Sequence, residues 1–285
     1  MIALALSGGG ERVVAWQVGV LAGLADGGVD LRGAPVVGTS AGALVAARLA
    51  AGVDPRDDAE LVVRVPPRPG GGSFDALAAA WEAAGTTTAE RRRALGRLAR
   101  ERSPGGAEEV VGRVAARLPG RGWPPSLRVV AIDARSGERV IFDVASGVPV
   151  ERAVAASRAI PTLRPPIEVG GREYIDGALG SGTNADVLAA PLVLVLTPVP
   201  PIGGVGPERW WAEALRDEVR GLERAGHRVV VVHASDGERA AMGPDPMSNA
   251  GAPLAVAAGR RRGRALAAEI RPRRAGYPYA AVTPA

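Results

Sequence analysis

The residues best suited to covalent chemistry surround Ser40, which lies between Gly38 and Gly42. An apolar run at 34–37 leads into this serine, and apolar residues at helical spacing follow it over 41–49. A Gly-x-Ser-x-Gly spacing is typical of a sharp strand-to-helix turn that exposes a nucleophilic hydroxyl. We expect glycine at both flanks because side chains there would collide with the neighbouring strand and helix. The helix N-terminus would also favour a developing negative charge, since its N–H groups point outward.

A second candidate element is the loop Gly8-Gly9-Gly10, which follows the apolar run 2–6. Consecutive glycines expose backbone N–H groups, which suits either a phosphate or the oxyanion of an acyl-transfer reaction. The dinucleotide fingerprint is not met, because Val13 stands where its third glycine belongs, and the lysine of a phosphate-binding P-loop is missing. The elbow on the next strand therefore favours an oxyanion hole formed by Gly8, Gly9 and Gly10.

A nucleophilic serine needs a base, and the residues leave two candidates open. Of the two histidines, His227 precedes a predicted strand and looks like a surface residue, whereas His233 ends that strand and could lie at the same sheet edge as Ser40. Asp176 also ends a predicted strand, is followed by Gly177, and would reach the serine directly as a two-residue dyad. Asp-Gly pairs are also common in plain turns.

The elements that must position these residues alternate between strands and helices. A strand, a glycine loop and a helix are followed by a strand, the elbow and a second helix, which predicts an α/β fold with a parallel sheet. We expect one domain over 1–285, with a poorly ordered Pro/Arg-rich tail from about 271. The predicted strands are 2–6, 34–37, 127–132, 139–144, 167–169, 173–175, 192–196 and 229–232. The later helical patterns are 74–81, 89–102, 110–118, 150–157, a stretch containing Trp211 to Leu222, and 252–270.

Composition excludes several function classes. The chain has no cysteine, which excludes disulfides and thiolate chemistry, and its isolated histidines have no metal-ligand spacing, so we expect no metal and no cofactor. A net charge of +5 is mild for 285 residues, and all the cations are arginine, so the chain gives no case for nucleic acid. The uncharged run 187–207 carries five prolines, which argues against a membrane span. The first residues lack the charged start of a signal peptide, and we expect a cytoplasmic protein.

Five segments of the chain carry short motifs in a fixed order: Leu6-Ser7-Gly8-Gly9-Gly10-Glu11-Arg12, Gln17-Val18-Gly19-Val20-Leu21, Gly38-Thr39-Ser40-Ala41-Gly42-Ala43, Ala156-Ser157-Arg158-Ala159-Ile160-Pro161 and Tyr174-Ile175-Asp176-Gly177-Ala178. Together these segments resemble the ordered motifs of patatin-like phospholipases. The resemblance covers about 2–196, and more loosely the C-terminal helix. Two departures are Val13, where a glycine usually follows the arginine, and Ala178, where a second glycine is common.

The resemblance implies a three-layer α/β/α sandwich and a serine acyl hydrolase that cleaves phospholipids or related lipid esters. It also implies that Ser40 and Asp176 form a Ser–Asp catalytic dyad and that Gly8, Gly9 and Gly10 form the oxyanion hole. The alternatives are a carboxylesterase of the α/β-hydrolase type with a Ser40-Asp176-His233 triad, whose chain order fits, and a catalytically silent protein that binds acyl lipids. The triad is disfavoured because only one strand precedes the elbow.

Two further segments bear on a lipid substrate. The Pro/Gly-rich segment 66–72 is predicted to be a flexible connection or a lid over the site. The arginine-rich stretch 89–102 is usually a solvated helix face, and it is also a candidate for peripheral contact with an anionic membrane surface. We therefore expect the partners to be a lipid ester substrate and, at most, a membrane surface.

Overall fold

The computed structural model describes residues 1–67, 74–120, 122–199 and 207–270. Within these residues the chain forms one eight-stranded sheet, ordered β5-β6-β3-β2-β1-β7-β8, with β4 also paired to β3. The strands are β1 (Ile2–Leu6), β2 (Val36–Thr39), β3 (Leu127–Asp133), β4 (Arg139–Phe142), β5 (Ile167–Val169), β6 (Arg172–Asp176), β7 (Leu192–Thr197) and β8 (Arg228–His233).

The sheet is mostly parallel, and β1 is the central strand of its parallel part. Strand β1 pairs in parallel with β2 and β7, and parallel pairing continues outward to β3 and β8. The hairpin β3–β4 and the strands β6 and β5 add antiparallel pairs at one side. Parallel strands place their carboxyl ends at one edge, so β1 and β2 deliver the glycine loop and the elbow to the same edge.

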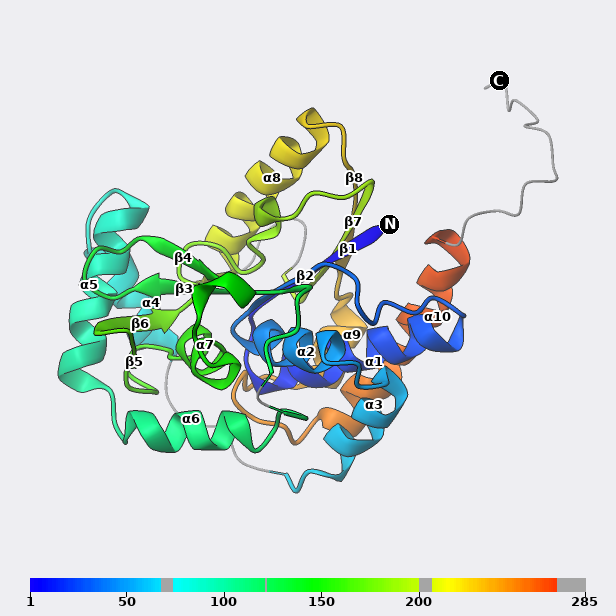
Figure 1. Ribbon diagram of the computed structural model, residues 1–285, viewed down its shortest axis with the longest axis horizontal. Helices are drawn as coiled ribbons and strands as arrows, with labels where there is room; N and C mark the ends of the chain where they lie inside the picture. Colours follow the sequence, from blue (N-terminus) through cyan, green and yellow to red (C-terminus); the bar gives the residue numbers. More distant parts are fainter. Residues whose placement is uncertain (68–73, 121, 200–206, 271–285) are drawn as a thin grey trace.

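Helices cover both faces of the sheet and make a three-layer α/β/α arrangement (Figure 1). Because side chains alternate along a strand, Leu4 and Leu6 enter one core while Ala3 and Ala5 enter another. The first core packs against α1, α2, α7 and α10, and the second against α8. A third core, beneath α4 and α5, covers the ends of β3 and β6. The helices are α1 (Glu11–Asp26), α2 (Ala41–Ala50), α3 (Pro55–Arg64), α4 (Phe74–Ala83), α5 (Thr88–Arg102), α6 (Ala107–Ala115), α7 (Val150–Ser157), α8 (Pro207–Arg224), α9 (Asp236–Met242) and α10 (Ala252–Ile270).

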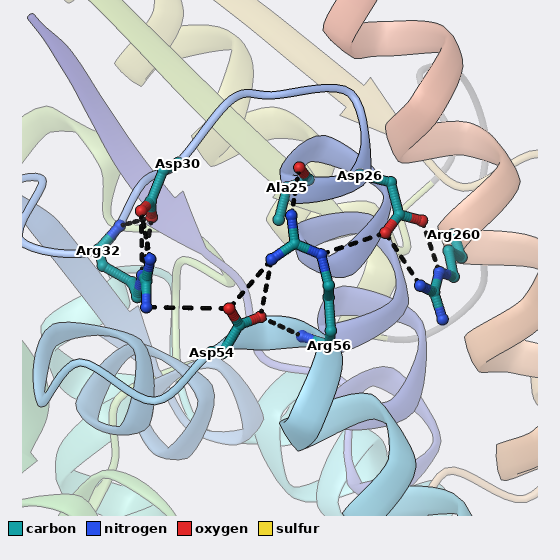
Figure 2. A network of polar contacts seen from close by, with 7 residues as sticks. All are labelled: Ala25, Asp26, Asp30, Arg32, Asp54, Arg56 and Arg260. Carbon is teal, nitrogen blue, oxygen red and sulfur yellow. Dashed lines mark hydrogen bonds and ion pairs between the residues drawn. The ribbon is translucent and has the colours of Figure 1, made fainter.

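A network of ion pairs fixes the outer end of α1 (Figure 2). Asp26, the last residue of α1, accepts hydrogen bonds from Arg260 of α10 at 2.6 and 2.9 Å and from Arg56 of α3 at 3.3 Å. Arg56 also donates to the carbonyl of Ala25 and pairs with Asp54, the N-cap of α3. Hydrogen bonds from Arg260 and Arg264 hold the pKa of Asp26 far below its usual range. The network therefore joins three helices that are distant in sequence.

The sequence-based element predictions hold except at five elements. The second strand is 36–39 rather than 34–37, and β4 ends at Phe142, where a short 3₁₀ turn at Val144–Ser146 follows. Helices α3 and α9 were not predicted, because each is short and begins from a local cap, Asp54 for α3 and Ser235 for α9, rather than from a long apolar stripe. Helix α6 begins three residues earlier than the predicted pattern.

Two predictions fall wholly or partly on residues that the structure does not describe. The proposed lid at 66–72 lies outside the described residues from 68 onward, and so does the whole tail from 271. The prediction of a single domain over 1–285 stays a prediction. In the described parts of the chain, no helix has both the length and the apolar character needed to cross a membrane.

Candidate active site

Ser40 occupies a strained turn between β2 and α2. Its φ of 51° and ψ of −113° are unusual for a residue with a side chain, and such strain is common where a nucleophile is exposed. A Cβ on Gly38 would lie 2.5 Å from the Cα of Ala43, and one on Gly42 would lie 2.1 Å from the carbonyl oxygen of Leu6. Both flanking glycines are therefore required by close backbone contacts, as the spacing predicted.

The structure brings Ser40 and Asp176 into direct contact although they are 136 residues apart. The Ser40 hydroxyl donates to Oδ2 of Asp176 at 2.7 Å, and both side chains are buried. The other carboxylate oxygen, Oδ1, accepts the backbone N–H of Ala178 at 2.8 Å. Each oxygen of Asp176 thus has one donor, and the carboxylate is oriented with Oδ2 toward the serine.

The glycine loop differs in one respect from the expectation. The N–H of Gly8 donates to the carbonyl of Gly182 at 2.9 Å, so it is already paired. Gly9 and Gly10 line the pocket beside Ser40, and within the described part of the chain neither N–H has a hydrogen-bond acceptor. Their φ values of 142° and 82° favour glycine. Of the three loop N–H groups, those of Gly9 and Gly10 are therefore the ones left without an acceptor among the described residues.

Ser157, the last residue of α7, holds the backbone of both candidate residues in place. Its hydroxyl accepts the N–H of Ser40 at 2.9 Å, and its carbonyl accepts the N–H of Gly177 at 3.1 Å. Ser157 is fully buried. Sequence reasoning quoted this serine only as part of a motif and assigned it no role. The signal that could have found it was the motif itself.

Sequence reasoning also missed a buried polar cluster that contacts the neighbours of Ser40 and Asp176 in the chain. Asn184, fully buried and with a positive φ of 48°, donates from Nδ2 to the hydroxyl of Thr39 at 3.1 Å and to the carbonyl of Gly177 at 3.3 Å. It thereby bridges the residue before Ser40 and the residue after Asp176. Glu218 of α8 accepts hydrogen bonds from Ser181, Thr183 and Ala185 in the same loop.

Burial sets the protonation of Asp176. Loss of solvent raises the pKa of this carboxyl to about 6, while the Ala178 N–H, the Ser40 hydroxyl and the nearby Arg164 and Arg158 oppose that rise. A carboxylate with a pKa near 6 is ionised at neutral pH and is a better proton acceptor than an ordinary aspartate. The electrostatics therefore suit a general base.

A cluster of ion pairs lies next to the backbone of Ser40. Glu11, in the first turn of α1, pairs with the buried Arg158, with Arg117 at 3.1 Å and with Arg164 at 3.7 Å. Burial opposes the charge of Glu11, but the three arginines lower its pKa to about 2. Arg158 also points Nη1 toward the carbonyl oxygen of Ser40, at 3.5 Å. Three cations around one anion give the region a net positive charge.

Ser40 and Asp176 lie in a narrow apolar pocket. Leu77 of α4 and Trp210 and Trp211 of α8 line it together with Ile160 and Leu179. Trp210 stacks on Trp81 with ring centroids 4.5 Å apart, and Trp211 donates from Nε1 to the carbonyl of Ala178 at 2.6 Å. The pocket volume is about 40 Å³, room for about three water molecules.

His233 does not lie with these residues. It ends β8, which is separated from β2 by β1 and β7, and its Nδ1 lies 2.7 Å from the carbonyl oxygen of Val199. Its ring borders a separate cavity between α8 and β8. The residues described by the structure also contain no group of three or more histidine, aspartate or glutamate side chains arranged to hold a metal ion.

Comparisons with known proteins agree with the motif pattern. The model of the patatin-like phospholipase family matches residues 4–189. A comparison with curated protein sequences found no significant match. Among solved structures, VipD from Legionella pneumophila is similar at 15% identity and a TM-score of 0.48, covering 94% of this chain and 66% of its own.

Two further structures are similar to this chain over a smaller share of their own length. The type III effector protein ExoU matches at 15% identity and a TM-score of 0.43, covering 94% of this chain and 53% of its own. ExoU in complex with SpcU from Pseudomonas aeruginosa matches at 17% identity and a TM-score of 0.43, covering 95% of this chain and 53% of its own. The chain thus spans from about half to two thirds of the structures it matches.

The family match covers more than half of the chain and includes the glycine loop, the elbow and the Asp-Gly segment. It confirms the resemblance drawn from the five motifs, and the sheet and its helical layers confirm the predicted α/β fold. The chain therefore belongs to the patatin-like phospholipase family, a family of lipid acyl hydrolases.

Proposed function

We propose that the protein hydrolyses ester bonds of phospholipids or related lipids through a Ser40–Asp176 dyad and an acyl-enzyme intermediate. The observation that carries this proposal is the 2.7 Å hydrogen bond from the Ser40 hydroxyl to Asp176 inside an apolar pocket. A serine and a base at this distance satisfy the geometric requirement for an activated nucleophile. The family membership supports the lipid ester as the substrate class.

In the first half of the reaction, Ser40 Oγ attacks the carbonyl carbon of the ester and its proton passes to Asp176 Oδ2. The tetrahedral intermediate then breaks the bond to the leaving alcohol, which takes the proton from Asp176. In the second half, water attacks the acyl-enzyme, Asp176 accepts the water proton, and Ser40 regains it as the fatty acid leaves. One carboxylate thus acts as base and then as acid in each half.

The oxyanion of each tetrahedral intermediate would be stabilised by the N–H groups of Gly9 and Gly10. Both lie beside Ser40 at the pocket wall, and the N–H of Gly8 is engaged elsewhere. A fixed donor aimed at a developing oxyanion contributes about 3–4 kcal/mol to transition-state stabilisation. The net positive cluster around Glu11 lies behind the same region and would favour the same charge.

The alternatives have less support in the geometry. A Ser40-Asp176-His233 triad would need the histidine between the serine and the aspartate, but Asp176 contacts Ser40 directly and His233 ends a strand three positions away in the sheet. A silent lipid-binding protein would not require the close Ser40–Asp176 contact, the strained turn and the two glycine N–H donors together.

Labelling with a serine-directed fluorophosphonate, combined with hydrolysis of a fluorogenic fatty-acid ester, tests the proposal. We expect Ser40→Ala to lose both signals, because Ser40 is the only hydroxyl among the described residues that lines this pocket. We expect Asp176→Asn to lower kcat by about 10²–10⁴-fold, the contribution of a positioned base. His233→Gln is the matched control and should retain activity. Labelling at another serine, or loss of activity in His233→Gln alone, would contradict the dyad.

A further inference from the structure

Arg92 lies at the rim of the pocket that contains Ser40. It projects from the first half of α5, and its Nε donates to the carbonyl of Leu179 at 2.7 Å. Leu179 itself lines the pocket, three residues after Asp176. The next residue, Gly180, lies against the rest of the guanidinium, since a Cβ there would be 2.6 Å from Nη2. The guanidinium is thus fixed in orientation one residue away from the pocket wall.

The charge of Arg92 has no carboxylate partner within the described residues, because none lies within ion-pair distance of its guanidinium. Its charged neighbour is another cation, Arg139, which is itself paired with Asp186. Burial, together with the repulsion from Arg139, lowers the pKa of Arg92 to about 10. Burial also lowers the pKa of Arg158 to about 10, but Arg158, unlike Arg92, is paired with a carboxylate, that of Glu11.

A half-buried cation without a counter-ion is costly, because it has lost hydration and gained no ion pair in return. One hydrogen bond to the Leu179 carbonyl uses Nε and leaves the Nη groups, whose fork geometry suits the oxygens of a phosphate. A phosphate at the pocket rim would supply the missing charge. A neutral lipid would leave the guanidinium without a counter-ion.

We propose that Arg92 is the residue that recognises the phosphate group of the substrate, so that the protein selects phosphate-bearing glycerolipids over neutral ones. This inference rests on the proposed hydrolase function, because it takes Ser40 as the site of ester cleavage. It singles out one arginine of the stretch 89–102 for a reason that composition cannot show. The other arginines of α5 include Arg97, which is exposed on a different side of the helix.

The experiment compares two substrates that differ only by a phosphate, 1-octanoylglycerol 3-phosphate and 1-octanoylglycerol. We expect the wild-type protein to prefer the phosphate-bearing ester, mainly through a lower KM. Arg92→Gln should lose about 10- to 100-fold of that preference, the usual effect of removing a charge-assisted bond to phosphate. Arg92→Lys should recover part of it, because the charge is kept. Arg97→Gln, the matched control, should leave the preference unchanged.

Equal losses on both esters in Arg92→Gln would overturn the proposal and make Arg92 a support for the Leu179 carbonyl alone. Free phosphate is tested separately, by adding inorganic phosphate to the assay with 1-octanoylglycerol. Inhibition that competes with the ester and weakens in Arg92→Gln supports the site. A response to inorganic phosphate with an unchanged preference between the two esters would overturn the assignment to a lipid head group.

Binding of octyl phosphate to the Ser40→Ala protein, measured by calorimetry, separates this inference from the proposed function. We expect the dissociation constant to rise about tenfold or more when Arg92→Gln is added, and to stay the same when Arg97→Gln is added. If no ester is hydrolysed but this pattern holds, the proposed function fails and the phosphate site stands. If esters are hydrolysed but Arg92→Gln leaves binding unchanged, the phosphate site fails alone.

Discussion

At the scale of single residues, the site depends on the buried carboxylate of Asp176. Asp176 is ionised at neutral pH only because two hydrogen bonds and two nearby arginines partly offset its burial. The same burial makes the carboxylate a stronger base than an exposed aspartate. Ser40 in turn is held by a strained backbone and by the hydroxyl of Ser157. These contacts align the hydroxyl with one particular carboxylate oxygen.

This environment predicts the pH dependence of activity. The value of kcat/KM on an uncharged ester should fall with acid, with an apparent pKa of about 6, because protonated Asp176 cannot accept the serine proton. The pH–rate profile between pH 4.5 and 9 measures it. A profile that is flat between pH 5 and 7 would show that Asp176 is not the base.

The stability of Asp176→Asn is the control for this interpretation. The folded-state pKa lies above the unfolded value of ~3.9, so the folded protein binds the extra proton and loses stability as the pH rises from about 4 to about 6. Removing the charge should therefore stabilise the fold by up to about 3 kcal/mol at pH 8 and have little effect near pH 4. Urea unfolding of both proteins at the two pH values measures the difference.

At the scale of secondary-structure elements, the helices α1 and α10 are packed unusually closely. Cβ atoms added at Gly23 and Gly259 would lie 2.1 Å from the carbonyl oxygen of Arg260 and 2.3 Å from that of Trp16. The ion pairs of Asp26 close the end of the same interface (Figure 2). Helix α1 begins directly after the glycine loop, so this packing also anchors the loop that faces Ser40.

Gly259→Ala should therefore destabilise the protein by about 1–3 kcal/mol, because a methyl group must push two backbones apart. Gly221→Ala, in α8, is the matched control, since a Cβ there meets no atom within 4 Å. The control should stabilise the protein by about 0.5–1 kcal/mol, because alanine loses less entropy in a helix. Chemical denaturation compares the variants. Equal effects of the two substitutions would mean that the α1–α10 contact adjusts freely.

At the scale of the whole molecule, the net charge and the pocket lining indicate whether the substrate is bound at a lipid surface or as a dispersed molecule. The net charge is +5, with arginine as the cation throughout, and the pocket is apolar and has Trp210 and Trp211 in its lining. An aggregate of anionic lipids would attract such a surface by about 1 kcal/mol per arginine close to it. We therefore expect the protein to act at a lipid surface rather than on dispersed molecules.

The test compares one phospholipid presented as monomers and as anionic vesicles, at low and at high salt. Hydrolysis should be faster on vesicles, and the advantage should shrink with salt because screening weakens exposed charges. Neutral vesicles of the same acyl composition are the control and should show little dependence on salt. Equal rates on monomers and vesicles, with a preference for short soluble esters, would favour a general carboxylesterase instead.

The sequence by itself determined the local features of the protein. Strand and helix patterns depend on residues that are neighbours along the chain, and β1, α1 and α2 follow them closely, whereas β2 begins two residues later than its apolar run. The glycines around Ser40 could be interpreted in the same way, because the collisions they avoid arise within one tight turn and its adjoining strand. The five motifs were enough to identify the family.

Only the tertiary structure decided between Asp176 and His233 as the neighbour of Ser40. Both end strands, and the choice depends on strand order, which places β6 next to β3 and β8 at the far edge. The same holds for the Gly8 N–H, whose partner Gly182 comes from a distant loop. It holds also for Arg92, because only the folded chain shows that no carboxylate of the described residues pairs with it. Contacts between distant segments depend on the order of the strands in the whole sheet, and a local sequence pattern does not specify that order.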